Sequence, residues 1–234
     1  MSEKKKLIIC TPSLTGPTAP YIKALEDSIP LIEAAGWEHG YVQAVGCPYI
    51  SGARANMLRS ALDAKADVIV FLDYDVSWRP ADLLKLIETE GDVCAGTYRV
   101  KSEQQDPSEF YMGTWDTNAD FTPKVRASDG AISAKLAPAG FLKITKEAVD
   151  KFMVAYPELC YGPMHHLSVD LFNHGVRDRI WWGEDYMFCN RWKDKCGDIW
   201  LVPDLSIDHH AKDKVYAGNL HQFLLRQPGG SEAQ

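Results

Sequence analysis

Two aspartates stand two positions apart at the end of the most apolar segment of the chain. Asp73 and Asp75 follow residues 68–72, an apolar run with the length of a buried strand. Two carboxylates at the end of one strand can converge on a single hard cation such as Mg²⁺ or Mn²⁺. The same spacing also occurs in surface turns, but the apolar strand directly before the pair favours the metal-binding interpretation over solvation alone.

A second acidic pair, Glu184 and Asp185, follows two tryptophans and a glycine and begins a predicted helix. Carboxylates are favoured at a helix N-terminus by the backbone dipole, so the pair has a purely structural interpretation. The alternative is that one of them is a general base, which takes a proton from a substrate in a pocket shaped by the tryptophans.

Histidines are the remaining candidates for metal ligands. His209 and His210 follow a predicted strand, where a histidine could complete a coordination sphere begun by Asp75. His165 and His166 form a competing pair with a weaker claim, because no predicted strand holds them. The six cysteines include no CxxC spacing, so a structural zinc site is not expected.

The elements that must position these residues alternate between strand and helix over the first hundred residues. Strands are predicted at 6–10, 37–45, 67–72 and 92–100, with helices at 21–35, 53–64 and 80–88 between them. This alternation predicts an open, largely parallel α/β sheet with helices on both faces. Ligands of such sheets collect at the carboxyl ends of the strands, which is where Asp73 and Asp75 stand.

The pattern changes beyond residue 102. Antiparallel strand pieces are predicted at 110–115 and 132–136, helices at 145–152 and 184–196, and a strand at 199–202. Residues 156–179 are rich in Pro, Gly, His and Asn and are predicted to form an irregular flap that orders over a bound substrate. The tail, 227–234, is predicted to be disordered.

The composition, with 46% hydrophobic and 24% charged residues, is typical of a globular protein in aqueous solution. Its 25 basic residues against 32 acidic ones give a net charge of −7, which makes sequence-independent coating of DNA an unfavourable function. No apolar run approaches the roughly 18 residues that a membrane helix needs. No secretion signal is evident before the first predicted strand, so we expect a cytoplasmic protein, in the host cytoplasm if the chain is viral.

Taken in order, these segments resemble the GT-A glycosyltransferases, particularly the family 2-like enzymes. The resemblance is carried by Thr11-Pro12, residues 51–56 (SGARAN), 71–75 (FLDYD), 138–142 (PAGFL), 183–185 (GED), and Pro203 followed six residues later by His209. It spans roughly residues 5–212, and small stand-alone enzymes of this kind are similar to those encoded by bacteriophages and large viruses. It implies the GT-A fold, an open mixed α/β sheet with helices on both faces. It also implies one domain over 1–226, in which 1–101 binds the nucleotide-sugar and 102–226 the acceptor.

The resemblance implies roles on the donor side of a sugar transfer. The donor would be a nucleotide-sugar, most simply a UDP-sugar. Thr11 and Pro12 would border the nucleobase and ribose, and Arg54 and Asn56 would reach the nucleotide. Tyr74, between the two aspartates, would also lie against the donor. The structural alternative for Arg54 is a solvated side chain at a helix start.

The resemblance also implies the metal and the catalytic base. Asp75 would ligate Mn²⁺ or Mg²⁺ between the two phosphates, with His209 as a further protein ligand and Asp73 near the ribose or the metal. A divalent cation stabilises the charge that develops on a leaving nucleoside diphosphate. Asp185, with Glu184 as its neighbour, would take the proton of the acceptor hydroxyl, and inversion at the anomeric carbon is the expected outcome.

Two other functions are compatible with the same residues. An apolar strand that ends in Asp-x-Asp is also the first motif of haloacid-dehalogenase-like phosphohydrolases, where the first aspartate, here Asp73, is the nucleophile. That motif usually stands near the start of the chain, whereas two strand–helix units precede it here. The other alternative is a non-catalytic module that binds a nucleotide or glycan. For a transferase, the acceptor is a glycan, a lipid, a protein or a modified DNA base.

Overall fold

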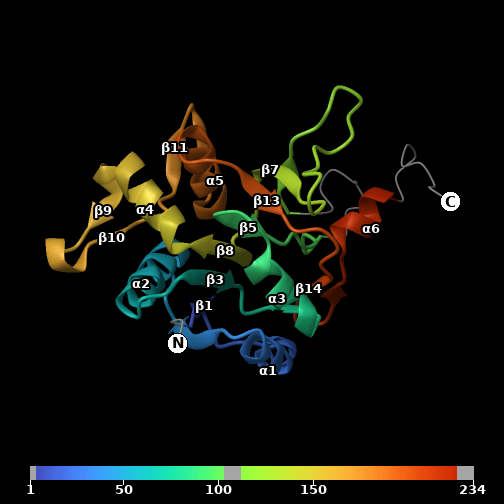
Figure 1. The fold of residues 1–234 in the computed structure, drawn as a ribbon, viewed down its shortest axis with the longest axis horizontal. Coiled ribbons are helices and arrows are strands. Elements are labelled where there is room, and N and C mark those ends of the chain that lie inside the picture. Colours follow the sequence, from blue (N-terminus) through green and yellow to red (C-terminus); the bar gives the residue numbers. More distant parts are fainter. Residues whose placement is uncertain (1–3, 103–111, 226–234) are drawn as a thin grey trace.

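The centre of the protein is a mixed sheet of eight strands in the order β2-β1-β3-β8-β5-β13-β7-β6 (Figure 1). The computed structural model describes residues 4–102 and 112–225. The strands are β1 (Lys6–Ser13), β2 (Glu38–Val45), β3 (Val68–Leu72), β5 (Val93–Ala95), β6 (Thr114–Trp115), β7 (Ile132–Leu136), β8 (Phe141–Thr145) and β13 (Ile199–Leu201). The predicted tail at 227–234 and the start of the piece predicted at 110–115 lie outside the described residues.

The sheet is parallel on one side and antiparallel in its middle. β1 pairs in parallel with β2 and with β3. β8 then pairs antiparallel with both β3 and β5, and β13 pairs parallel with β5 and antiparallel with β7. The expectation of a largely parallel sheet therefore holds for β2, β1 and β3, and elsewhere among the described strands only for the β5–β13 pair. The chain therefore has a mixed α/β architecture. β8 comes from the second half of the sequence and lies antiparallel between β3 and β5.

Helices cover both faces of the sheet (Figure 1). They are α1 (Ala19–Ala34), α2 (Ile50–Asp63), α3 (Pro80–Glu88), α4 (Lys146–Ala155), α5 (Glu184–Lys195) and the short α6 (Leu220–Leu225). Side chains of α1 and α3 form one buried core, and those of α2, α4 and α5 form the other. Alternate residues of β3 enter the two cores, Val70 on the α1 side and Ile69 and Phe71 on the α2 side, as the pleat of a strand requires. The prediction that this strand is covered on both faces is confirmed.

A small three-stranded sheet joins the end of β3 to a late part of the chain. It consists of β4 (Val76–Trp78), β14 (Ile207–His210) and β15 (Val215–Tyr216), in the order β15-β14-β4. β14 runs antiparallel to β4, with His209 opposite Val76. Because β4 begins directly after Asp75, this pairing brings the histidines of β14 next to the second aspartate.

The segment predicted as an irregular flap, 156–179, has regular structure. Two single-turn 3₁₀ helices, η2 (Pro157–Leu159) and η3 (Met164–His166), accompany the hairpins β9 (Cys160–Tyr161)–β10 (Ser168–Val169) and β11 (Gly175–Arg177)–β12 (Ile180–Trp182). Val169, Leu171 and Phe172 are fully buried and fix the segment against the core. The prediction of an irregular loop is wrong, because strands of two or three residues are too short to show a period in the sequence.

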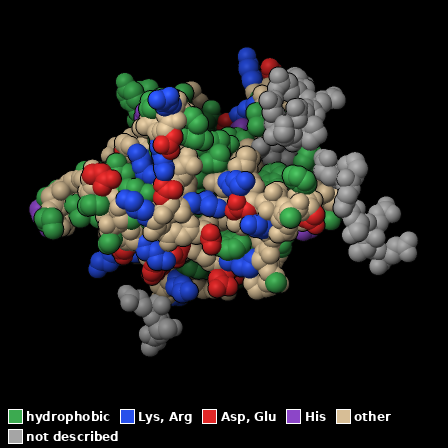
Figure 2. All heavy atoms as spheres, turned by 90° about the horizontal axis from the view of Figure 1, so that it is seen from above, with side chains coloured by type: hydrophobic (Ala, Val, Ile, Leu, Met, Phe, Trp, Pro, Cys, Tyr) green, Lys and Arg blue, Asp and Glu red, His purple; other side chains and the backbone are tan. Residues whose placement is uncertain are grey.

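The surface carries charges of both signs. Figure 2 shows lysines and arginines interspersed with acidic side chains over the face it presents. Such a mixture differs from the continuous basic stripe that sequence-independent DNA binding uses. Over residues 4–102 and 112–225, the helices fall short of the length and apolar character needed to cross a membrane.

Candidate active site

A cavity of about 270 Å³ lies at the carboxyl ends of β1, β2 and β3. It is lined by Pro12, Ser13, Leu14, Cys47, Pro48, Ile50, Ala53, Asp73, Tyr74, Asp75, Tyr98, Met112 and His209. Parallel strands end together at one edge, and open α/β sheets bind their ligands there. The two aspartates of the central motif therefore lie where the sequence predicted a ligand site.

Asp75 faces His209. Nε2 of His209 lies 3.7 Å from Oδ1 of Asp75. Nδ1 of the same ring lies 2.8 Å from the carbonyl oxygen of Arg99, which can only accept, so Nδ1 carries the proton. Burial lowers the pKa of His209 and favours the neutral ring, in which Nε2 has a free lone pair. A carboxylate oxygen and a neutral imidazole nitrogen are both ligands that a divalent cation such as Mn²⁺ could take.

His210 and His166 bond other groups. Nε2 of His210 lies 2.7 Å from the hydroxyl of Ser77, so His209 is the member of its pair that faces Asp75. Nδ1 of His166 lies 3.0 Å from Asp63 at the C-terminal end of α2, whereas the cavity is at the N-terminal end of that helix. His165 and His166, which have the weaker claim on sequence grounds to be metal ligands, are not among the described residues that line the cavity.

The residues present fit a cation that arrives with a substrate. Within the part of the chain that the structure describes, no cluster of three or more His, Cys, Asp or Glu side chains is arranged to hold a metal. Asp75 and His209 nevertheless supply two donors, and Mg²⁺ is commonly held by one or two carboxylates together with substrate phosphates and water. The ammonium of Lys101 forms an ion pair with Oδ2 of Asp75, a contact that no sequence motif indicated.

Asp73 is bound from the interior of the protein. Nη2 of Arg54 donates to Oδ1 at 2.8 Å, and the hydroxyl of Tyr98 donates to Oδ2 at 3.2 Å. The backbone N–H of Asp73 donates to the carbonyl of Gly140 at 2.9 Å. A Cβ at Gly140 would overlap both the carboxylate of Asp73 and the Tyr98 hydroxyl, so this close approach needs glycine. Both oxygens of Asp73 thus have protein partners, whereas Oδ1 of Asp75 faces the cavity-lining His209.

Arg54 is a buried cation in the middle of the site. Only 1% of its surface is exposed, and its Nε lies 3.6 Å from Oε1 of Glu184. Its guanidinium therefore links Asp73, which follows β3, to Glu184, which begins α5. A buried charge is tolerated when it is paired in this way. The sequence predicted that Arg54 reaches the nucleotide or is solvated; in the structure it lies inside the protein and holds two carboxylates.

Asp185 has the environment of a general base. Burial, and next the charge of Glu184, raise the pKa of Asp185 to about 6, against the opposing effect of Arg54. The N–H of Tyr186 donates to its Oδ1 at 2.8 Å. A carboxylate with a pKa just below neutral is mostly ionised at pH 7 and still basic enough to take a proton. The sequence offered two adjacent acids, Glu184 and Asp185, as the candidate base. In the structure Glu184 forms an ion pair with Arg54, whereas Asp185 has no such partner among the described residues and has the raised pKa.

The remaining donor-side predictions divide into two groups. Pro12 and Tyr74 line the cavity. Thr11 is buried and its hydroxyl is hydrogen-bonded to that of Tyr21, so it packs inside β1. Asn56 is exposed and lines a different groove, of about 620 Å³, between α2 and the β9–β10 hairpin. The structure therefore brings the first two to the site and leaves the other two away from it.

Three residues that sequence reasoning missed belong to the site. Ser13 lies beside the Thr11-Pro12 motif, and its hydroxyl is buried without a hydrogen-bond partner among the described residues. Tyr98 and Lys101 follow β5, within the predicted strand at 92–100 or just beyond it. That strand is shorter than predicted, Val93–Ala95, and the chain beyond it passes the cavity. In the sequence, the only signal that Ser13 belongs to the site is its position directly after Thr11-Pro12.

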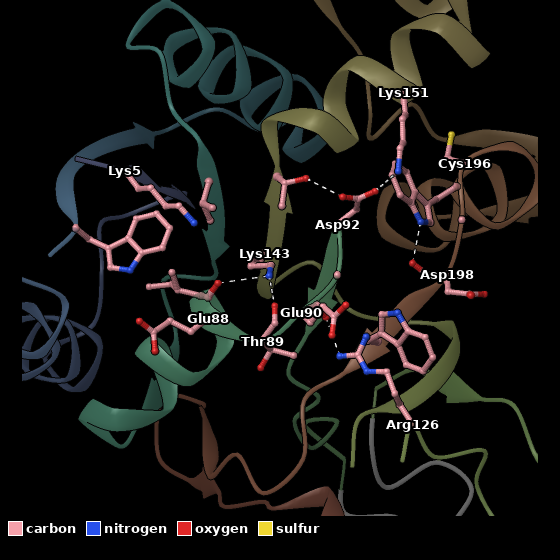
Figure 3. Close-up of a pocket in the computed structure, with 18 of the residues that line it drawn as sticks. Lys5, Glu88, Thr89, Glu90, Asp92, Arg126, Lys143, Lys151, Cys196 and Asp198 are labelled. Carbon is pink, nitrogen blue, oxygen red and sulfur yellow. Dashed lines mark hydrogen bonds and ion pairs between the residues drawn. The ribbon is translucent and has the colours of Figure 1, made fainter. Parts of the chain in front are cut away.

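A larger cavity of about 1420 Å³ lies at the opposite edge of the sheet, next to residues that precede β1 and β13 (Figure 3). Three of the cations that line it bond protein groups. Lys151 pairs with Asp92, Lys143 donates to carbonyls at the end of α3, and Arg126 donates to the carbonyl of Glu90. Because these groups satisfy one another, we assign the candidate site to the carboxyl edge.

Comparison with known proteins adds no family to this geometry. Neither a scan against protein-family models nor a search of curated proteins found a match to the chain. The chemistry of the site therefore rests on its own residues.

Proposed function

We propose that this chain is a metal-dependent glycosyltransferase of the GT-A type, which transfers a sugar from a nucleotide-sugar, most simply a UDP-sugar, to an acceptor hydroxyl. The observation that carries the proposal is the pair formed by Asp75 and the unprotonated Nε2 of His209 in a cavity at the ends of β1 and β3. The mixed sheet, with helices on both faces, is compatible with this fold type.

Asp75 and His209 are the residues that would hold Mn²⁺ or Mg²⁺. When bound, such a cation supplies Lewis-acid stabilisation of the charge on the departing nucleoside diphosphate. Pro12 and Tyr74 border the space next to this pair, where the nucleoside part of the donor would lie. Asp73 remains hydrogen-bonded to Arg54 and Tyr98, and these bonds hold the end of β3 in place.

Asp185 is the proposed base for the acceptor. The acceptor oxygen forms its bond to the anomeric carbon while the bond from that carbon to the diphosphate oxygen breaks. The hydroxyl proton passes to the carboxylate of Asp185. Glu184, which is paired with Arg54, lies next to Asp185, and its negative charge contributes to the raised pKa of Asp185. Attack from the side opposite the leaving group gives inversion.

The phosphohydrolase alternative has less support from the contacts of Asp73. A nucleophilic aspartate needs an oxygen that can reach phosphorus. Here one oxygen bonds Arg54 and the other bonds Tyr98, both buried.

Calorimetry with UDP tests the proposal. We expect UDP to bind the wild-type protein much more tightly with Mn²⁺ than without it. Asp75→Asn should abolish that gain, because an amide lacks the charge that a divalent cation requires. Asp213→Asn is the matched control, since Asp213 is exposed and lines a neighbouring cavity of about 740 Å³. Unchanged Mn²⁺-dependent binding in Asp75→Asn would refute the site assignment.

A labelled UDP-sugar then identifies the reaction and the acceptor. Slow Mn²⁺-dependent release of UDP from the donor indicates a transferase without its acceptor. Adding glycan, lipid, protein and hydroxymethylated DNA in separate reactions should accelerate release with one of the four. A phosphoenzyme trapped on Asp73 would instead support the hydrolase.

A further inference from the structure

Asp75 already has a cationic partner in Lys101. The ammonium of Lys101 bonds Oδ2 of Asp75, while Oδ1 faces His209 at 3.7 Å. Both side chains of the ion pair are largely withdrawn from solvent, with 30% of Lys101 and 14% of Asp75 exposed. The two partners approach from different cavities. His209 lines the cavity of about 270 Å³, and Lys101 lines a second one of about 740 Å³ that also borders Tyr74 and Asp75.

This arrangement places two cations in competition for one carboxylate. A divalent cation on Oδ1 of Asp75 and an ammonium on Oδ2 would lie within a few ångströms of each other and repel, and burial strengthens that repulsion. A diphosphate changes the balance, because its oxygens offer Lys101 a second anionic partner. The lysine stem is flexible enough to move its compact charge between neighbouring acceptors.

We propose that Lys101 is a donor-binding residue that lets a divalent cation occupy Asp75 only together with the diphosphate of the donor. The proposal rests on the proposed function, since it takes Asp75 and His209 as the cation site. In the free protein, Lys101 neutralises Asp75 and opposes binding of the cation alone. In the loaded protein, it bonds a phosphate oxygen and stabilises charge on the leaving group.

Manganese titrations of three variants test this role. Free Mn²⁺ is counted by electron paramagnetic resonance without nucleotide, and UDP affinity is then measured at saturating Mn²⁺. Lys101→Met keeps the length of the side chain and removes its charge. Lys101→Arg keeps the charge. Lys212→Met removes an exposed lysine that lines the same 740 Å³ cavity and is the matched control.

Opposite changes in the two affinities are expected for Lys101→Met. Mn²⁺ alone should bind about 10-fold more tightly or better, and UDP at saturating Mn²⁺ about 10-fold more weakly, the scale on which a single neighbouring charge acts in a partly buried site. Lys101→Arg and Lys212→Met should retain the wild-type values. Circular dichroism verifies that each variant is folded.

Two results overturn the proposal. If Lys101→Met binds Mn²⁺ no better than wild type, there is no competition. If it binds UDP as well as wild type, Lys101 does not contact the diphosphate. Asp75→Asn, measured in parallel, separates these results from failure of the proposed function. UDP binding that needs neither Mn²⁺ nor Asp75 refutes the function itself, whereas binding that needs both and ignores Lys101 refutes only the role of Lys101.

Discussion

Replacing Asp185 with asparagine should stabilise the protein at neutral and alkaline pH. Burial, with the adjacent charge of Glu184, raises the pKa of Asp185 from 3.8 to about 6. In the unfolded chain the carboxyl is solvated and loses its proton near the ordinary value. Keeping it ionised in the folded protein therefore costs free energy. At about 1.4 kcal/mol per pH unit, the cost is about 3 kcal/mol once the pH exceeds both values.

The sign of the effect follows from the raised pKa of the folded protein. Below about pH 4 the carboxyl of Asp185 is protonated in both states and costs nothing. Between about pH 4 and pH 6 the unfolded chain releases the proton more readily, so the wild type loses stability as the pH rises. Asp185→Asn lacks this proton, and its amide oxygen can still accept the hydrogen bond from Tyr186.

Urea unfolding at about pH 4 and about pH 8, followed by tryptophan fluorescence, measures the difference. We expect Asp185→Asn to match the wild type at the lower pH and to exceed it by about 3 kcal/mol at the higher one, while being inactive. Asp178→Asn, at a side chain that is 84% exposed, is the control and should follow the wild type. A constant difference between Asp185→Asn and wild type across this range would show that the carboxyl is not desolvated.

Two further predictions concern the buried arginine and the hairpin segment. Arg54→Met should lower the free energy of unfolding by about 3–5 kcal/mol, because Asp73 and Glu184 lose their buried cation. Arg59→Met on the same helix is the control, and an equal loss in both would contradict the pairing. In limited proteolysis, cleavage within 156–179 should occur first at the exposed tip around Met164 and should be unaffected by UDP and Mn²⁺, because the tip lies at the C-terminal end of α2, away from the cavity. Cleavage that slows when nucleotide is added would show instead that the segment closes over the donor.

Local periodicity in the sequence is sufficient for most of the elements. The predicted helices at 21–35, 53–64, 80–88, 145–152 and 184–196 are present as α1 to α5, with ends that differ by a few residues. Thr145, the first residue of the predicted helix at 145–152, caps α4, since its hydroxyl accepts from the N–H of Ala148 at 3.1 Å. These features depend on neighbours within about one helical turn, and the sequence contains those neighbours.

The central strand β8 shows where local patterns stop being informative. It was absent from the predicted elements, because Lys143 interrupts its apolar run. In the structure Lys143 is only 3% exposed, and burial lowers its pKa. Its ammonium bonds the carbonyls of Ile87 and Thr89 at the end of α3, more than 50 residues away. A lysine can be a core residue only when such distant acceptors exist, and a pattern of neighbours does not contain them.

The sequence by itself determined which residues could do chemistry, and tertiary structure decided what each one touches. Asp75, His209 and Asp185 were recognisable from type and spacing next to a strand or helix end. That Arg54 is buried between Asp73 and Glu184 required elements 19 and 130 positions away to meet. The pairing of Lys101 with Asp75 likewise depends on how the chain passes the end of β3. Charge interactions act through space, so they are defined only once the order of the strands is set.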